Sequence, residues 1–210
     1  MLPRSSFLRQ SCAAALVVLA SVSSVLAVRG RQKPYAPEAP AYRQQGEASA
    51  PVIVVEYSDF QCPACRFAMT PVKELLSLYG KDLRLIFKHY PLVQHPLARA
   101  AAEAAECAGR QGRFWEFHDK LYGQQAEWTK DQDASRLSVY AKDLGLDTAA
   151  FAACLKDPAA AALVEADRKE GDDRWVLSTP TFFINGKRFA GSQQLTGNGI
   201  PWIDKILKKK

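Results

Sequence analysis

The 210-residue sequence predicts an α/β fold in which a small sheet carries a long helical insertion. Three observations support this prediction. An apolar run at residues 52 to 57 leads into a C-x-x-C motif and then into helical spacing. Helical periodicity dominates from about residue 95 to residue 175. The chain then returns to two short β-type runs around Asn185-Gly186, a pair typical of a tight hairpin.

The first strand and the helix after it are predicted as follows. Residues 52 to 57 are almost continuously apolar, which indicates a strand buried on both faces. Residues 62 to 79 predict a helix, in which Pro71 would introduce a kink. Gly80 ends this helix, and residues 83 to 90 predict a second strand. The apolar face expected for the helix consists of Phe67, Val72, Leu75, Leu76 and Tyr79.

The insertion is predicted to contain several helices. Alanine-rich residues 95 to 109 indicate the first, the aromatic residues between 114 and 122 the second, and residues 135 to 144 the third. Asp147, and Asp157 followed by proline, are capping signals for two more helices.

The chain after the insertion is predicted to return to the sheet. Residues 181 to 184 and 187 to 190 indicate the two strands of the hairpin, and Pro201 begins a final amphipathic helix. The order of strand, helix, strand, helical block, hairpin and helix predicts a thioredoxin-like fold with a helical insertion.

Residues 1 to 31 predict a signal peptide or an uncleaved signal-anchor. Residues 11 to 28 carry no charge, and Arg4 and Arg9 precede them. The apolar run is long enough for a short membrane span, while small residues around Ala27 also allow a cleavage site. Both alternatives place the rest of the chain outside the cytoplasm, where disulfides persist.

The rest of the chain is predicted to consist of a linker and one domain. Residues 32 to 45 are rich in Pro and Ala and lack periodicity, as a linker does. The folded domain is expected over residues 46 to 210, with its helical insertion at about residues 95 to 175. The formal net charge of +6 does not indicate a nucleic-acid surface, because eight basic residues flank the first apolar stretch or form the C-terminal tail. Without these eight residues, a charge of about −2 is left for the rest of the chain.

The motif Cys62-Pro63-Ala64-Cys65 follows the first predicted strand and opens the predicted helix. This position indicates a redox site, because the free N–H groups and the dipole at a helix N-terminus stabilise a thiolate. Such placements lower a cysteine pKa from about 8.5 to roughly 3.5–7.5. A zinc site is one alternative, but zinc needs four ligands, and the other cysteines and the three histidines form no second ligand pair. A pair of inert core cysteines is the other alternative.

Three segments of the sequence together resemble the DsbA-like thiol:disulfide oxidoreductases of the bacterial envelope. The segments are EYSDFQCPAC at residues 56 to 65, FKHYPL at residues 87 to 92 with His95-Pro96 after it, and STPTFFING at residues 178 to 186. The resemblance implies a thioredoxin fold with a helical insertion and disulfide exchange with exported proteins. The chain departs from the family at Ala64, since well-studied members carry a histidine between the cysteines that stabilises the thiolate.

Roles are expected for five residues of this site. Cys62 is the expected nucleophile and Cys65 the resolving thiol. Pro180 resembles the cis-proline that faces the C-x-x-C in this family, and Thr179 would offer its backbone to an extended substrate and its hydroxyl to the thiolate. Glu56 lies in an apolar strand, so its pKa should be raised, and it could pass a proton to or from Cys65. A solvated glutamate at a strand edge is the alternative for Glu56.

Cys107 and Cys154 lie in the predicted helical block. They are expected to form a structural disulfide between two of its helices, with two free buried thiols as the alternative. Closing a loop of this length contributes about 4 kcal/mol in the chain-entropy model. The three histidines of the chain are expected to be structural.

The sequence therefore predicts a thiol:disulfide oxidoreductase of the bacterial periplasm or cell envelope, exported or anchored to the inner membrane. It is expected to donate disulfides to exported cysteine-containing proteins and to be reoxidised by a DsbB-like, quinone-linked membrane protein. The dithiol is itself the redox group, so no flavin, haem or metal cofactor is expected. One alternative is a membrane-anchored reductase for a few clients, which Ala64 leaves open. The other is a non-enzymatic binding or copper-carrier module with Cys62 and Cys65 as ligands.

Overall fold

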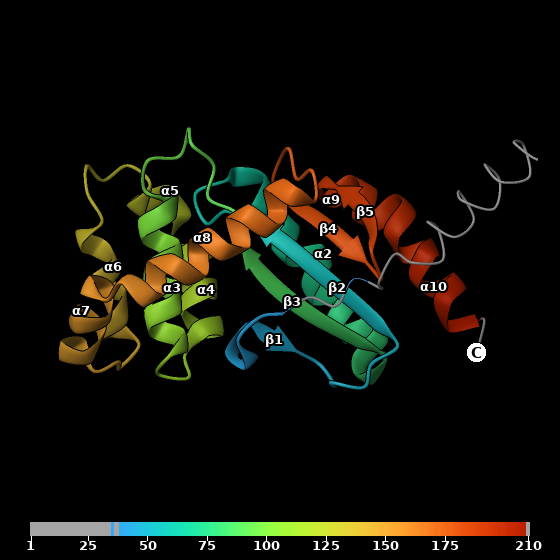
Figure 1. Cartoon of the computed structure of the whole chain (residues 1–210), viewed down its shortest axis with the longest axis horizontal. Coiled ribbons are helices and arrows are strands. Elements are labelled where there is room, and N and C mark those ends of the chain that lie inside the picture. The colour runs from blue at the N-terminus through green and yellow to red at the C-terminus, as the bar shows by residue number, and fades with distance from the viewer. Residues whose placement is uncertain (1–34, 36–37, 209–210) are drawn as a thin grey trace, which may run out of the picture. The chain divides into compact units, whose positions relative to one another are not determined.

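A five-stranded sheet lies at the centre of the structure, a computed structural model that describes residue 35 and residues 38 to 208 (Figure 1). The strand order is β1-β3-β2-β4-β5, and β2 and β3 run parallel while all other neighbours are antiparallel. The strands are β1 (Gln44–Gln45), β2 (Val52–Ser58), β3 (Leu83–His89), β4 (Thr181–Ile184) and β5 (Lys187–Ala190).

Strand β2 is the central strand and carries Glu56. In the strand register Glu56 lies beside Phe87 of β3 and Phe182 of β4. Side chains alternate along a strand, so Val54 and Glu56 point to the same face of the sheet. On that face Val54 packs with apolar residues of α2 and α10 in one buried cluster. Glu56 is therefore a carboxyl on an otherwise apolar, covered face.

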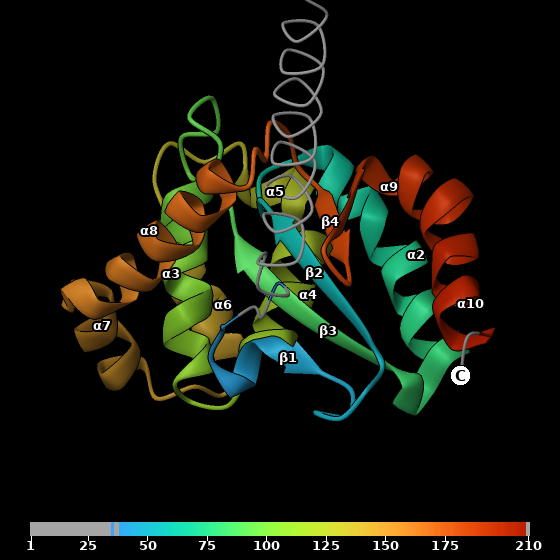
Figure 2. The ribbon, with the colours of Figure 1, turned by 45° about the vertical axis from the view of Figure 1, so that its right-hand side comes forward.

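Helices cover both faces of the sheet. Helices α2, α9 and α10 lie on one face, and α8 crosses the other (Figure 2). The remaining helices of the insertion stand beside the carboxyl ends of β2 and β3. The helices are α2 (Pro63–Tyr79), α3 (Ala98–Gly109), α4 (Phe114–Gly123), α5 (Gln125–Trp128), α6 (Ser135–Asp143), α7 (Thr148–Lys156), α8 (Pro158–Asp173), α9 (Gly191–Gln194) and α10 (Ile200–Lys208).

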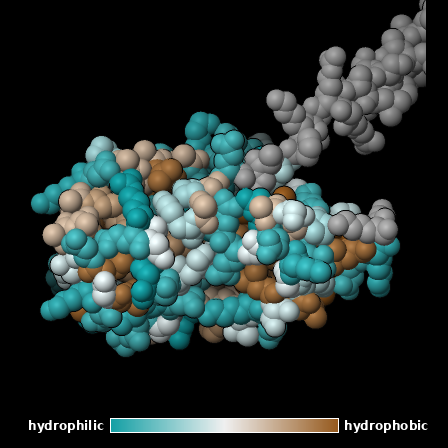
Figure 3. All heavy atoms as spheres, turned by 90° about the horizontal axis from the view of Figure 1, so that it is seen from below, coloured by the Kyte–Doolittle hydropathy of each residue, from teal (hydrophilic) through white to brown (hydrophobic). Residues whose placement is uncertain are grey.

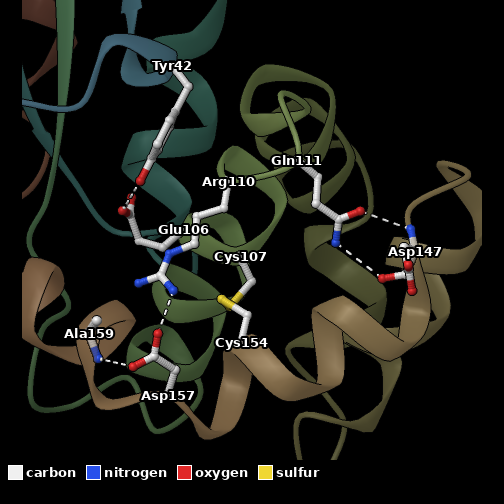
Figure 4. Close-up of a disulfide and its surroundings, with 9 residues drawn as sticks. All are labelled: Tyr42, Glu106, Cys107, Arg110, Gln111, Asp147, Cys154, Asp157 and Ala159. Carbon is white, nitrogen blue, oxygen red and sulfur yellow. Dashed lines mark hydrogen bonds and ion pairs between the residues drawn. A yellow bond between two sulfur atoms is a disulfide. The ribbon is translucent and has the colours of Figure 1, made fainter.

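A disulfide joins Cys107 on α3 to Cys154 on α7 (Figure 4). The two residues are 47 positions apart, and their Cα atoms lie 5.7 Å from each other. Polar contacts flank the disulfide on both sides: Arg110 with Asp157 at 2.7 Å, and Gln111 with the backbone of Asp147 at 2.9 and 3.2 Å. The end of α3 is thus tied to both ends of α7.

A buried cluster of charged side chains links the start of the domain to the sheet and the insertion. The Arg43 guanidinium, only 1 % exposed, contacts the Glu106 carboxylate at 3.2 Å and also the Asp167 carboxylate. His89 lies 2.8 Å from Glu106, and Lys88 lies 3.1 Å from Asp167. Each buried charge has an opposite charge or a hydrogen-bonding partner, as burial in a core requires.

The fold class predicted from the sequence is confirmed, and the strands, the hairpin and the helical insertion lie close to the predicted positions. The chain, however, joins the fold earlier than predicted. Residues 41 to 45 were expected to belong to the linker, but Ala41–Arg43 forms a short 3₁₀ helix and Gln44–Gln45 pairs with β3. The buried partners of Arg43 explain why this polar stretch is ordered.

Helix α2 buries the predicted side, where Val72 and Leu75 are buried and Leu76 and Tyr79 pack against the same apolar cluster, and only Phe67 departs from the prediction. Its buried residues are Cys65, Ala68, Val72 and Leu75. Phe67, expected on the apolar face, lies off that side and is 73 % exposed. The helix is continuous through Pro71. The short helix α9 and the π-helical turn Leu195–Gly199 were not predicted at all.

The predicted N-terminal segment and the surface of the described residues are considered together. The signal or anchor segment predicted for residues 1 to 31 lies outside the described residues. Within the part of the chain that the structure describes, no helix is both long and apolar enough to span a bilayer. On the face seen in Figure 3, apolar residues form several separate patches among hydrophilic ones.

Candidate active site

Cys62 caps the N-terminus of α2, and Pro63 occupies the first turn. The loop before Cys62 is held by Asp59, whose Oδ1 accepts a hydrogen bond from the Gln61 backbone at 2.7 Å. Asp59 Oδ2 lies 2.7 Å from His95 Nδ1. The Gln125 side chain donates to the carbonyl oxygen of Cys62 at 3.0 Å. The helix start is therefore fixed from both β2 and the insertion.

The two cysteines are free thiols at different depths. Cys62 is 7 % exposed and Cys65, one helical turn further along, is 1 % exposed. The Cys62 Sγ lies 3.5 Å from the backbone oxygen of Thr179, to which it donates when protonated, and the backbone N–H of Asp59 donates to Cys65 Sγ at 3.5 Å. The Thr179–Pro180 peptide bond is cis. Residues far apart in the sequence thus meet at the C-x-x-C pair.

The pKa of Cys62 is lowered to about 5. The largest cause is a hydrogen bond from the Cys65 thiol, and Thr179 and the backbone N–H groups of Ala64 and Cys65 lower it further. The Thr179 hydroxyl is buried and has no hydrogen-bond partner among the described residues, so it is free to donate to the thiolate. The thiolate is stabilised without a histidine between the cysteines.

The pKa of Cys65 is shifted in the opposite direction, well above its ordinary value. Burial is the main cause, and proximity to the Cys62 sulfur adds to it. A buried thiol of this kind ionises only when a nearby base removes its proton. The site therefore contains one thiolate and one thiol at neutral pH.

A chain of polar groups leads away from Cys65 beneath the cysteines. Ser58 Oγ donates to Glu56 Oε1 at 2.9 Å and lies 2.9 Å from the Tyr122 hydroxyl. The single hydroxyl proton of Ser58 can instead turn toward the Cys65 sulfur, and that hydrogen bond lowers the pKa of Cys65. Glu56 is 5 % exposed, and burial raises its pKa to about 7. A carboxyl with that pKa can accept or donate a proton near neutral pH.

Sequence reasoning missed several residues that shape this site. Ser58 and Asp59 follow an apolar strand and precede the C-x-x-C motif, and polar residues at that place were the available signal. Tyr122 was considered only as one of the aromatic residues that predict a helix. Gln125 carried no signal in the sequence, because its contact with Cys62 joins residues 63 positions apart.

Exposed apolar side chains occur in the segments that carry the cysteines and the cis-proline. Phe67 lies on α2 just after Cys65, and Trp175 and Leu177 precede Thr179. All three are largely exposed. Apolar side chains at such positions can bind the apolar parts of an unfolded polypeptide. As for metals, no group of three or more His, Cys, Asp or Glu side chains in the described residues is arranged to hold an ion.

The chain is similar to known proteins over most of its length. Residues 38 to 198 match the family model described as Thioredoxin. Over 152 residues the chain is 43 % identical to the Na(+)/H(+) antiporter NhaA 1 of Salinispora arenicola, a match that covers 72 % of this chain and 22 % of the antiporter. The chain thus spans about a fifth of the length of that relative and is similar to one part of it.

Solved structures show the same likeness. A thioredoxin-like oxidoreductase from Silicibacter pomeroyi is 25 % identical with a TM-score of 0.65, over 81 % of this chain and 94 % of that chain. DsbA2 of Pseudomonas aeruginosa is 26 % identical with a TM-score of 0.66, over 80 % of this chain and 98 % of that chain. A family match over most of the sequence shows that this chain belongs to the thioredoxin family, and the helical insertion gives it the DsbA-like form of that fold.

Proposed function

We propose that this chain is a thiol:disulfide oxidoreductase of the bacterial cell envelope that donates disulfides to exported cysteine-containing proteins. The observation that carries the proposal is the position of the two sulfurs, with Cys62 at the N-terminus of α2 beside the Thr179 backbone and Cys65 buried behind it. The pKa is accordingly lowered at Cys62 and raised at Cys65. A dithiol in which one thiolate is stabilised favours its own reduced state, and it therefore favours oxidation of a client.

The proposed reaction begins with the Cys62–Cys65 disulfide. A client thiolate attacks Cys62 Sγ, and Cys65 leaves as a thiolate that takes a proton supplied through Ser58 and Glu56. A second client thiolate then attacks the client sulfur of the mixed disulfide, and Cys62 leaves as the stabilised thiolate. The client loses two electrons and gains a disulfide, while the chain gains a Cys62 thiolate and a Cys65 thiol.

The size of the effect follows from the Cys62 pKa. At pH 7, a pKa of about 5 in place of the ordinary value near 9.0 stabilises the reduced form by about 3 kcal/mol. For a two-electron couple this raises the reduction potential by about 60 mV. The shift supports the oxidising direction even though Ala64 replaces the histidine of well-studied family members.

The proposal includes two kinds of partner, the client proteins that are oxidised and the electron acceptor that reoxidises this chain. Exposed Phe67, Trp175 and Leu177 suit unfolded clients, whose apolar side chains are still accessible. The reduced chain needs an electron acceptor, and a DsbB-like, quinone-linked membrane protein is the proposed one. A signal peptide or anchor at residues 1 to 31 would bring the domain to the envelope.

The test is the reduction potential of the Cys62–Cys65 pair, measured by equilibration with glutathione. A Cys12→Ser background is used so that the thiol of Cys12 does not contribute to the measured thiol content. A potential well above about −270 mV, toward the value of about −120 mV typical of strong oxidants, supports a disulfide donor. A potential near about −270 mV would overturn that direction and indicate a reductase that serves a few clients.

A further inference from the structure

A small cavity lies behind the active site, between α2, α4 and the face of the sheet that carries Glu56. It has a volume of about 50 Å³. Glu56 lines one part of it, and Lys73, His118 and Asp119 line another, with apolar side chains of α2 and β3 between them. A water molecule needs roughly 10–15 Å³ of such space, so the cavity has room for a few waters.

The buried end of the cavity contains a carboxyl that the protein only partly satisfies. Among the described residues, the Ser58 hydroxyl alone hydrogen-bonds the Glu56 carboxyl, through Oε1. The second oxygen, Oε2, is therefore left for water. Trp115 also lines the cavity, and its Nε1–H is buried with no partner among the described residues. Two unsatisfied polar groups beside one small space indicate bound water.

At the outer end of the cavity, three polar side chains in contact with one another extend to the surface. His118 Nδ1 lies 2.9 Å from Asp119 Oδ1, and Lys73 Nζ donates to Asp119 Oδ2 at 2.8 Å. The side chain of His118 is 9 % exposed, whereas those of Asp119 and Lys73 are 46 % and 59 % exposed. Because the Asp119 carboxylate holds the proton on Nδ1, the other ring nitrogen, Nε2, is the one left to accept a proton from water.

The surroundings of His118 keep its ring neutral and ready to accept a proton. Burial lowers the pKa of His118, and the charges of Lys73 on α2 and His89 on β3 lower it further, while Asp119 on its own helix raises it. Glu56 on β2 is the other titratable group at this cavity, and its pKa is about 7. Since the pKa of His118 is lowered, its protonated ring gives up a proton readily, and it can pass on a proton that reaches it from Glu56.

We propose that this cavity holds the water path by which the proton exchanged between Cys65 and Glu56 reaches solvent, with His118 as the relay at its outer end. The proposal rests on the proposed function, because it extends the proton role of Glu56. When the reduced pair is oxidised, Cys65 loses its proton to Glu56, and Glu56 passes it through cavity water to His118 Nε2. His118 then releases its Nδ1 proton to solvent beside Asp119, which returns the carboxyl to its starting state and leaves the ring proton on Nε2. Exchange of the ring protons with water restores the starting tautomer before the next turnover.

The test is the oxidation of the reduced full-length chain, in the Cys12→Ser background, by glutathione disulfide in a stopped-flow instrument. Attack by the Cys62 thiolate is the phase that depends on glutathione concentration. Formation of the Cys62–Cys65 disulfide is the phase that does not depend on glutathione concentration. Only this phase requires the Cys65 proton to leave. His118→Asn keeps a donor toward Asp119 and removes the relay nitrogen, and Glu116→Gln on the exposed side of α4 is the matched control.

We expect His118→Asn to slow the second phase by about tenfold or more and to leave the first unchanged, since proton transfer by a placed group contributes roughly 10²–10⁴-fold. Added imidazole buffer should restore the rate of His118→Asn, because a small base can replace the relay, and it should not restore Glu56→Gln. A purely structural role of His118 would change both phases and would not respond to buffer. Glu116→Gln should behave like the parent chain.

The outcomes separate this proposal from the proposed function. If Glu56→Gln slows the second phase and His118→Asn does not, the relay is wrong and the proton role of Glu56 stands. If neither variant slows it, the proton role of Glu56 also fails. If the Cys62–Cys65 pair does not exchange with glutathione at all, the proposed function fails. Should His118→Asn not fold, the half-exposed Asp119→Asn must slow the second phase in a buffer-dependent way, and an unchanged rate overturns the relay.

Discussion

Replacing Cys65 tests how the Cys62 thiolate is stabilised. The largest contribution to the low Cys62 pKa is the hydrogen bond from the Cys65 thiol. Cys65→Ala removes this donor, and Cys65→Ser replaces it with a hydroxyl of similar size. The two variants differ by one donating group in a position that is 1 % exposed, so they form a matched pair.

The size of the change follows from the energy of a single hydrogen bond. A hydrogen bond to a charged group contributes about 1.5–3 kcal/mol, and a thiol is a weak donor, so the lower end applies. One pKa unit corresponds to about 1.4 kcal/mol, so Cys65→Ala should raise the Cys62 pKa from about 5 to about 6. The backbone N–H groups of α2 and the Thr179 hydroxyl remain, so the pKa should stay below its ordinary value. Cys65→Ser should leave it at or below the parent value, because a hydroxyl is the stronger donor.

The assay is a pH titration of thiolate absorbance in the ultraviolet, in a Cys12→Ser background where Cys62 is the single free thiol. Unfolding by urea, followed for each variant, checks that all three proteins have the same fold over the titration range. Equal Cys62 pKa values in Cys65→Ala and Cys65→Ser would refute the reasoning, because they would assign the shift to the helix N-terminus and Thr179 alone.

The reduction potential of the Cys62–Cys65 pair should fall by about 59 mV per pH unit below the Cys62 pKa and by about 30 mV above it, because the reduced pair then binds one proton fewer. Glutathione equilibria across the pH range should show the break near pH 5, and a uniform slope would contradict it. Glu56→Gln should raise the free energy of unfolding at pH 8 by about 3 kcal/mol. The folded pKa of about 7 exceeds the unfolded one, so the parent chain loses stability as pH rises from about 4.5 to 7 and the variant does not, and urea titrations that show parallel curves would count against this. Removing the Cys107–Cys154 disulfide by Cys107→Ser with Cys154→Ser should lower the free energy of unfolding by about 4 kcal/mol and leave the reduction potential unchanged, and a shifted potential would mean that this disulfide acts on the active site.

Most of the fold was predictable because its signals are local. The hairpin depends on two residues that accept positive φ, and the structure has Asn185 at 47° and Gly186 at 84°. The position of Cys62 at a helix N-terminus depends on the apolar strand before it and the helical spacing after it. Each of these features is decided within about ten residues, so a single sequence contains enough information to place it.

The parts that could not be predicted depend on contacts between distant segments. Ser58 and Tyr122 are 64 positions apart, and their hydroxyls meet only because α4 packs beside the end of β2. His118 was expected to be structural, and nothing near it in the sequence indicates that it lines the same cavity as Glu56. Arg43 was assigned to the linker because its buried partners, Glu106 and Asp167, lie far away in the sequence, in the insertion.

The depth of the two sulfurs explains why one of them needs a proton path and the other does not. Cys62 is the more exposed sulfur, and donors at the start of α2 stabilise its thiolate, so in the proposed reaction it attacks or leaves without a proton at neutral pH. Cys65 lies deeper, where burial disfavours its thiolate, so every turnover must bring a proton to it or take one away. Bulk water does not reach a sulfur that is 1 % exposed. Glu56 meets that need, because it is a buried carboxyl with a pKa near 7 that Cys65 reaches through Ser58 and that the hydrated cavity connects to the surface. Burying Glu56 lowers the stability of the folded chain, and this loss of stability accompanies its role in proton transfer at Cys65.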